Sequence, residues 1–124
     1  FADDIRGRGL VIDNPNAPKT VQEIAPTEAD DRIAAGKLTL VDVRPPEERA
    51  TASVSRPFEV LDGDGIQRLQ ALPKDTPLAF LCHHGGRSLQ AAEHFRNQGF
   101  THVYNVTGGI DAWSDSVDGG VPKY

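Results

Sequence analysis

Short, mostly apolar runs separated by segments with helical patterns limit this chain to very few folds. The clearest runs are residues 38–43, 78–81 and 102–106, and they lack the strict alternation expected of a strand with one wet face. A shorter extended run covers residues 21–24, and another covers 58–61 directly after a proline. Because proline is confined to edge positions in sheets, we expect residues 58–61 to lie at a sheet edge.

Helices are expected between these runs. Thr27 is a candidate N-cap for a helix that ends before Gly36, since glycine readily adopts the left-handed conformation of a helix stop. The remaining helical segments are expected at residues 45–50, 65–72, 88–98 and 110–113. Alternation of strands and helices predicts an α/β fold with an open parallel sheet flanked by helices on both faces.

The composition suits one globular domain and excludes several classes of protein. The chain has 124 residues, a net charge of −5 and a single cysteine. Neither an intrachain disulfide nor a multi-cysteine zinc site can therefore form. No apolar run approaches the ~20 residues that cross a bilayer, so no membrane association is expected. Mild acidity argues against a nucleic-acid partner, which would favour a basic face.

The chain divides into two unequal parts. Residues 1–19 combine charge, glycine and two prolines, so we expect a linker or the tail of a preceding domain, and residues 20–124 are expected to form the domain. The chain begins with Phe1 and contains no methionine, which indicates a piece of a longer polypeptide. No signal-peptide pattern opens it, and a cytoplasmic location is expected.

A reactive cysteine is predicted where the second apolar run ends. Cys82 follows residues 78–81, and a helix opens near Ser88 after a loop that contains Gly85 and Gly86. In open α/β sheets, ligands bind beyond the carboxyl ends of the strands. The two glycines allow the loop to turn sharply and aim its amides inward, and such a nest stabilises an anion.

The charges around the loop favour a thiolate. Arg87 adds a permanent positive charge, and His83 and His84 add partial ones. The alternative interpretation of Cys82 is a small buried apolar residue without reactivity. A metal site is not expected, because three consecutive ligands at 82–84 would make poor tetrahedral geometry, and no cofactor is expected.

Two charged residues end the first apolar run and are expected near the same edge of the sheet. Asp42 and Arg44 either form a structural ion pair or help to shape the site, and the sequence leaves both possibilities open.

The length of the loop bears on its chemistry. Four residues separate Cys82 from Arg87, whereas the loop of cysteine phosphatases is one residue longer. The smaller ring of amides suits a single sulfur atom better than a phosphate, and Leu81 stands where those phosphatases have histidine. Sulfur transfer is therefore favoured, with a non-catalytic module that binds a partner or a persulfide as the alternative, and a phosphatase or arsenate reductase as the less favoured one.

These motifs resemble one family. The loop Cys82–Ser88 resembles the active-site loop of single-domain rhodaneses, and Asp42-Val43-Arg44 resembles the signature of their second strand. Residues 99–106 and the run Gly108–Trp113 are similar to the segment after their active-site helix. The resemblance covers about residues 20–124, although residues 51–58 depart from the Gly-His-Ile-x-Gly-Ala run common in the family.

The resemblance implies a thiosulfate or persulfide sulfurtransferase. Cys82 would be the nucleophile and would carry sulfur as a covalent persulfide, and His83, His84, Gly85, Gly86, Arg87 and Ser88 would bind the substrate. The partners would be a small thiophilic donor and acceptor, such as cyanide, or a thiol protein. Residues 1–18 weakly resemble the tail of an A-type iron–sulfur carrier, which would place iron–sulfur or glutaredoxin machinery in the same parent chain.

Overall fold

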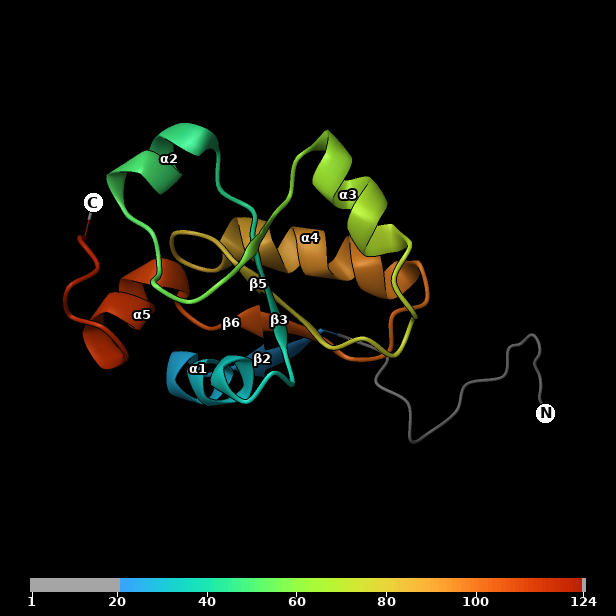
Figure 1. Cartoon of the computed structure of the whole chain (residues 1–124), viewed down its shortest axis with the longest axis horizontal. Helices are drawn as coiled ribbons and strands as arrows, with labels where there is room; N and C mark the ends of the chain where they lie inside the picture. Colours follow the sequence, from blue (N-terminus) through green and yellow to red (C-terminus); the bar gives the residue numbers. More distant parts are fainter. Residues whose placement is uncertain (1–20, 124) are drawn as a thin grey trace.

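The computed structural model describes residues 21–123, and its centre is a five-stranded parallel sheet (Figure 1). The strands lie in the order β2-β6-β5-β3-β4, and a helix lies between each strand and the next one along the chain. Their bounds are β2 Gln22–Ile24, β3 Thr39–Asp42, β4 Glu59–Val60, β5 Leu78–Leu81 and β6 Val103–Val106.

The all-apolar run at residues 78–81 forms β5, the central strand of the sheet. All four residues of β5 are buried, and the strand pairs with β3 on one side and β6 on the other. The expected edge strand is present as β4, which pairs only Glu59 and Val60 with β3. The predicted open parallel sheet is therefore confirmed.

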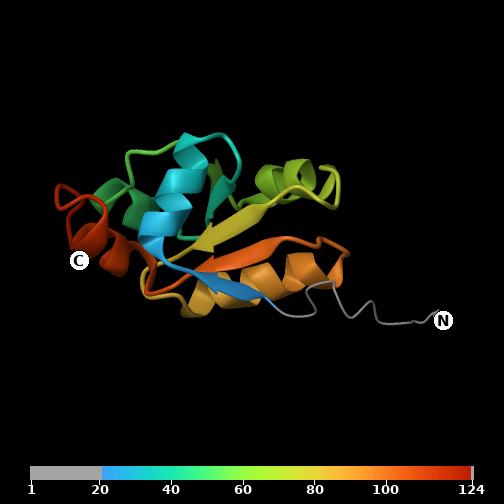
Figure 2. The same ribbon diagram turned by 90° about the horizontal axis from the view of Figure 1, so that it is seen from below.

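Helices cover both faces, as the alternating pattern predicts (Figure 2). One face packs against α1 and α5, and the opposite face packs against α3 and α4. Their bounds are α1 Pro26–Ala34, α2 Pro46–Thr51, α3 Gly63–Gln70, α4 Gly86–Asn97 and α5 Gly109–Ser116. Within residues 21–123, no helix has both the length and the apolar character needed to cross a membrane.

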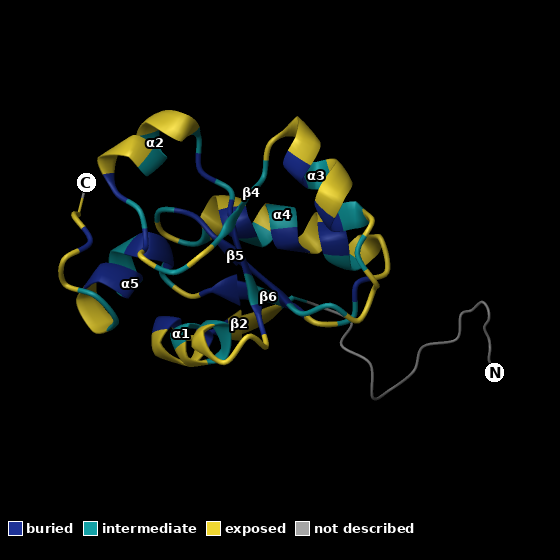
Figure 3. Ribbon diagram, in the orientation of Figure 1, coloured by how far each residue is buried: buried dark blue, intermediate teal, exposed yellow. Residues whose placement is uncertain are grey.

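The two cores each hold large apolar side chains, and the helices turn their exposed residues outward (Figure 3). Trp113 of α5 is 1% exposed and packs in the first core. In the second core, Phe95 lies between Phe80 and Phe100, with ring centroids 5.2 Å and 5.6 Å away. These tilted ring pairs favour one arrangement of α4 on the sheet.

Two helix starts differ from the sequence-based expectation. Thr27 is not the N-cap of α1; the helix begins at Pro26, two residues earlier than a cap at Thr27 would place it, and Ala25 precedes it without a side-chain cap. Proline suits this first position because its missing N–H would have had no helical partner. Likewise α4 begins at Gly86, two residues before Ser88, because Gly85 adopts a positive φ of +106° that turns the chain directly into the helix.

Asp42 and Arg44 form a buried ion pair at the end of β3. Arg44 Nη2 lies 2.7 Å from Asp42 Oδ2, and both side chains are 0% exposed. Arg44 Nε and the Arg44 amide also donate to Asp42 Oδ1, at 3.0 Å and 2.9 Å. Arg44 Nη1 reaches the carbonyl of Glu48 in α2 at 3.4 Å, so the pair anchors α2 to the sheet.

Removal of one partner from this pair should be strongly destabilising. We expect Arg44→Met to lower the free energy of unfolding by about 3–5 kcal/mol, because Asp42 would remain as a buried charge without its cation. The double variant Asp42→Asn/Arg44→Met should recover part of that loss. Urea unfolding followed by circular dichroism measures both values, and equal stabilities for wild type and Arg44→Met would contradict the assignment.

Candidate active site

The candidate site lies at the carboxyl end of β5, where the sequence placed it. Cys82 directly follows the strand, and its carbonyl accepts a hydrogen bond from the amide of Ile110 at 2.8 Å. The carbonyl of His83 accepts from the amide of Asp111 at 3.2 Å. The first turn of α5 is thereby fastened to the loop that follows Cys82.

The loop closes around the sulfur. Gly85 N–H points at Cys82 Sγ, with 3.0 Å between nitrogen and sulfur, and Ser88 Oγ lies 3.3 Å from the same sulfur. The positive φ of Gly85 gives the amide this direction, and a residue with a Cβ adopts that conformation rarely. The predicted inward-facing amides are therefore present around Cys82.

Opposing effects act on the thiol. Cys82 is 1% exposed, and burial, the largest single influence, raises the pKa of its thiol. Hydrogen bonding from the Ser88 hydroxyl, together with the backbone amides of Ser88, Gly85 and His84, lowers that pKa. The lowering effects together exceed the effect of burial, so the pKa of Cys82 lies below its ordinary value. The interpretation of Cys82 as an inert apolar residue does not account for this environment.

A chain of polar side chains continues from Ser88 to the edge of the sheet. Ser88 Oγ lies within hydrogen-bond distance of both the Cys82 sulfur and Asn105 Oδ1 of β6, and its single proton is donated to one of them at a time. Asn105 Nδ2 lies 3.1 Å from both a Glu23 carboxylate oxygen and the Gly85 carbonyl. Thr107 Oγ1 also donates to Glu23, at 2.9 Å. Asn105, which is 3% exposed, therefore ties the serine and the glycine of the loop to one another.

Sequence reasoning missed Asn105 and Glu23 as neighbours of the site. The signal that could have found Asn105 is an amide within an otherwise apolar strand, since a buried polar side chain requires partners. Glu23 carries no such signal, because its approach to Asn105 follows from the pairing of β2 with β6.

Close backbone packing explains the glycine at the first position of α5, Gly109. A Cβ on Gly109 would lie 2.4 Å from the carbonyl oxygens of Cys82 and His83, and its φ is +63°. The first turn of α5 could not approach the loop this closely with any other residue at that position.

The other predicted loop residues lie at different depths. His83 is partly buried and His84 is exposed, and their rings stack with centroids 3.9 Å apart. Gly86 is exposed at the start of α4. Arg87 forms a two-pronged ion pair with Glu48, with both nitrogen–oxygen distances at 2.9 Å. Glu48 therefore joins α2 to the loop.

Asp42 and Arg44 lie behind this contact rather than against the sulfur. Arg44 holds α2 through the Glu48 carbonyl, and the Glu48 carboxylate holds Arg87. The structure thus favours the interpretation of Asp42 and Arg44 as a structural pair. Hollows of about 250 Å³ and 260 Å³ border Thr39, at the amino end of β3, so they lie at the opposite end of the sheet from Cys82.

Fold and site together define a class of protein. It is an α/β protein with helices on both faces of a parallel sheet and a cysteine held by loop amides beyond the carboxyl end of one strand. The comparisons with known proteins narrow that class. The rhodanese-like domain family matches residues 25–116. The chain belongs to the rhodanese-like family, and the resemblance found in the sequence is confirmed.

Individual relatives agree with this assignment. The thiosulfate sulfurtransferase GlpE of Pseudomonas paraeruginosa is 33% identical over 94 residues, which cover 76% of this chain and 84% of that protein. The chloroplastic rhodanese-like/PpiC domain-containing protein 12 of Arabidopsis thaliana is 38% identical over 105 residues, which cover 79% of this chain but 34% of that protein.

Solved structures share the fold. A rhodanese-like domain protein from Staphylococcus aureus has a TM-score of 0.64 at 26% identity, with coverage of 84% of this chain and 99% of that one. A rhodanese-related protein from Thermoplasma volcanium has a TM-score of 0.62 at 27% identity, with coverage of 82% and 95%.

Ser88→Ala should raise the pKa of Cys82, because the hydroxyl that stabilises the thiolate is lost. The midpoint of the pH–rate profile for alkylation by iodoacetamide should move to higher pH, and the rate at pH 6 should fall. Ser114→Ala is the matched control, since Ser114 is also buried and its hydroxyl donates to the Val121 carbonyl, remote from the thiol. An unchanged midpoint in Ser88→Ala would contradict the assigned role.

Proposed function

We propose that this rhodanese-type sulfurtransferase moves sulfane sulfur from thiosulfate or a persulfide donor to a thiol or cyanide, with Cys82 as nucleophile and carrier. In the first half-reaction, the Cys82 thiolate attacks the outer sulfur of thiosulfate. A new S–S bond forms on Cys82, the S–S bond of thiosulfate breaks, and sulfite leaves with the electron pair. The product on the protein is an anionic persulfide.

The second half-reaction returns the protein to its starting state. Cyanide attacks the outer persulfide sulfur, a C–S bond forms, and the S–S bond breaks with its electrons on the Cys82 thiolate. Thiocyanate leaves, and the two half-reactions balance without an outside oxidant or reductant. Because this chain has a single cysteine, it cannot discharge the persulfide by an internal disulfide. The acceptor is therefore a small thiophile or a protein thiol that lies outside these 124 residues.

One observation carries the proposal: the loop amides and Ser88 converge on the sulfur of Cys82. Gly85 N–H at 3.0 Å and Ser88 Oγ at 3.3 Å stabilise negative charge there, which both half-reactions need. The same donors can receive the terminal anionic sulfur of a persulfide. The short loop supports transfer of one atom rather than attack on a phosphate.

Arg87 is the group proposed to organise the anionic end of the donor. In the resting structure its guanidinium is paired with Glu48, and the two side chains are 46% and 24% exposed. A sulfite-like anion that approaches Arg87 must compete with the Glu48 carboxylate. Glu48 would therefore weaken the binding of a dianionic donor relative to a neutral or thiol-bound one.

The proposal extends to the cellular location and to the parent chain. A cytoplasmic location and a parent chain that also carries iron–sulfur or glutaredoxin machinery fit a sulfur carrier, since thiols abound in that compartment. The residues that carry the second expectation, 1–18, lie outside the described range.

Sulfur transfer is tested most directly at Cys82. Wild-type protein should produce thiocyanate from thiosulfate and cyanide, and Cys82→Ser should show no rate above buffer. Mass spectrometry after thiosulfate treatment should find one added sulfur atom on wild type and none on the variant. Loss of this mass on addition of cyanide would complete the cycle.

The same protein samples distinguish sulfur transfer from the two alternative functions. A non-catalytic binding module would show equal, background thiocyanate production by wild type and Cys82→Ser. A phosphatase would release phosphate from an aryl phosphate, which we do not expect from the short loop. Either result would overturn the proposal.

Glu48→Gln should lower the KM for thiosulfate, because Arg87 then loses its competing carboxylate. Arg87→Gln should raise that KM. The kcat should change less in both variants, since the Gly85 amide and the Ser88 hydroxyl at the sulfur stay in place. Steady-state kinetics at low and high salt make the comparison, and the difference should shrink at high salt because the pair is partly exposed. Identical KM values would contradict the proposed role of Arg87.

A further inference from the structure

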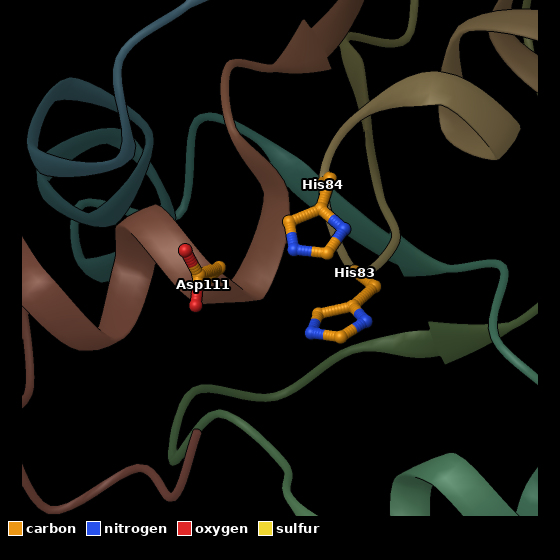
Figure 4. A group of neighbouring side chains, drawn as sticks. All are labelled: His83, His84 and Asp111. Carbon is orange, nitrogen blue, oxygen red and sulfur yellow. The ribbon is translucent and has the colours of Figure 1, made fainter. Parts of the chain in front are cut away.

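A second group of ligand-type side chains lies beside the cysteine loop. His83, His84 and Asp111 each present one ligand atom, and these three atoms lie within 4.8 Å of one another (Figure 4). The sequence argued against a metal because three consecutive ligands, with Cys82 among them, would fit poorly. The structure offers a different third donor, a carboxylate from α5 that lies far away in the chain.

The backbone holds this third donor in place. The amide of Asp111 donates to the carbonyl of His83 at 3.2 Å, and the neighbouring amide of Ile110 donates to the carbonyl of Cys82 at 2.8 Å. Gly109 permits this approach because it has no Cβ, which would lie 2.4 Å from the carbonyl oxygens of Cys82 and His83. Asp111 is thus fixed relative to the histidines by main-chain contacts that do not depend on its own side chain.

We propose that His83, His84 and Asp111 bind a borderline divalent cation of the Zn²⁺ class. Two imidazoles and one carboxylate are donors suited to such ions, and they leave coordination positions open to water or a ligand. No ion is present in the structure. The ligand atoms are side-chain atoms and do not include the Cys82 sulfur, whereas His84 donates to that sulfur through its backbone amide, so the proposal does not depend on sulfur transfer.

The imidazole rings must be reoriented before the group can bind an ion. Ligand atoms about 2.0–2.1 Å from a tetrahedral ion are about 3.4 Å apart, a separation within the 4.8 Å that bounds the present spacing. The two imidazole planes are 22° apart in a stack, so one ring must rotate to aim its nitrogen at a shared ion. His84 is exposed and can rotate without disturbing the core.

Lys123 competes for the same carboxylate. Its Nζ lies 3.4 Å from an Asp111 oxygen and 2.8 Å from an Asp115 oxygen. A bound cation would displace the longer contact, and Lys123 would keep its shorter one. We therefore expect removal of the lysine charge to strengthen metal binding.

Zinc binding is measured by calorimetric titration of the full chain, without an affinity tag and in the Cys82→Ser background, so that the thiolate contributes nothing. One equivalent of Zn²⁺ should bind. Asp111→Asn and His84→Ala should each weaken binding by more than about tenfold, as even outer-shell changes at metal sites commonly do. Lys123→Gln should tighten it.

Asp64→Asn is the matched control, since Asp64 also lies in the first turn of a helix and is exposed. It should leave the affinity unchanged. Because His84 is exposed, its variant should fold even if Asp111→Asn does not, and thermal unfolding checks both. Absence of binding at millimolar zinc, or unchanged affinity in His84→Ala and in folded Asp111→Asn, would overturn the proposal.

Discussion

The hydrogen bond from the Gly85 amide to the sulfur of Cys82 is the contact on which the site depends. It requires a positive φ at Gly85, a helix that starts one residue later, and a strand that delivers the cysteine to the edge of the sheet. Each requirement is met by local chain geometry. The energetic result is a buried sulfur whose pKa is nevertheless lowered, because the donors around it outweigh burial.

Two sets of contacts hold the cysteine loop in place. On one side Asn105 contacts both the Ser88 hydroxyl and the Gly85 carbonyl, so the two residues beside the sulfur share one partner. On the other side the buried pair of Asp42 and Arg44 anchors α2, whose Glu48 holds Arg87. A rigid arrangement of this kind suits catalysis in which charge stays on one atom, since donors that are already oriented need no rearrangement.

The first turn of α5 gives the loop a third contact and a chemical feature of its own. Main-chain bonds from Ile110 and Asp111 fix the carbonyls of Cys82 and His83, and they bring a carboxylate beside two imidazoles. Because this fastening involves backbone atoms, the side chains that project from it are open to other uses. The proposed cation site is one such use, next to the cysteine but separate from its sulfur.

The amino-acid pattern was enough to predict the class of fold, the position of the cysteine and the glycines that shape its loop, because strand periodicity and backbone freedom are local properties. The pattern misplaced the cap of α1, where Pro26 starts the helix ahead of Thr27, and the start of α4, where the turn at Gly85 starts the helix ahead of Ser88. Folding of the whole domain was needed to show that Asn105 reaches Ser88, that Glu48 meets Arg87 and that Asp111 lies beside His83. These contacts join segments far apart in the chain, and strand order and helix packing, rather than spacing along the sequence, bring them together.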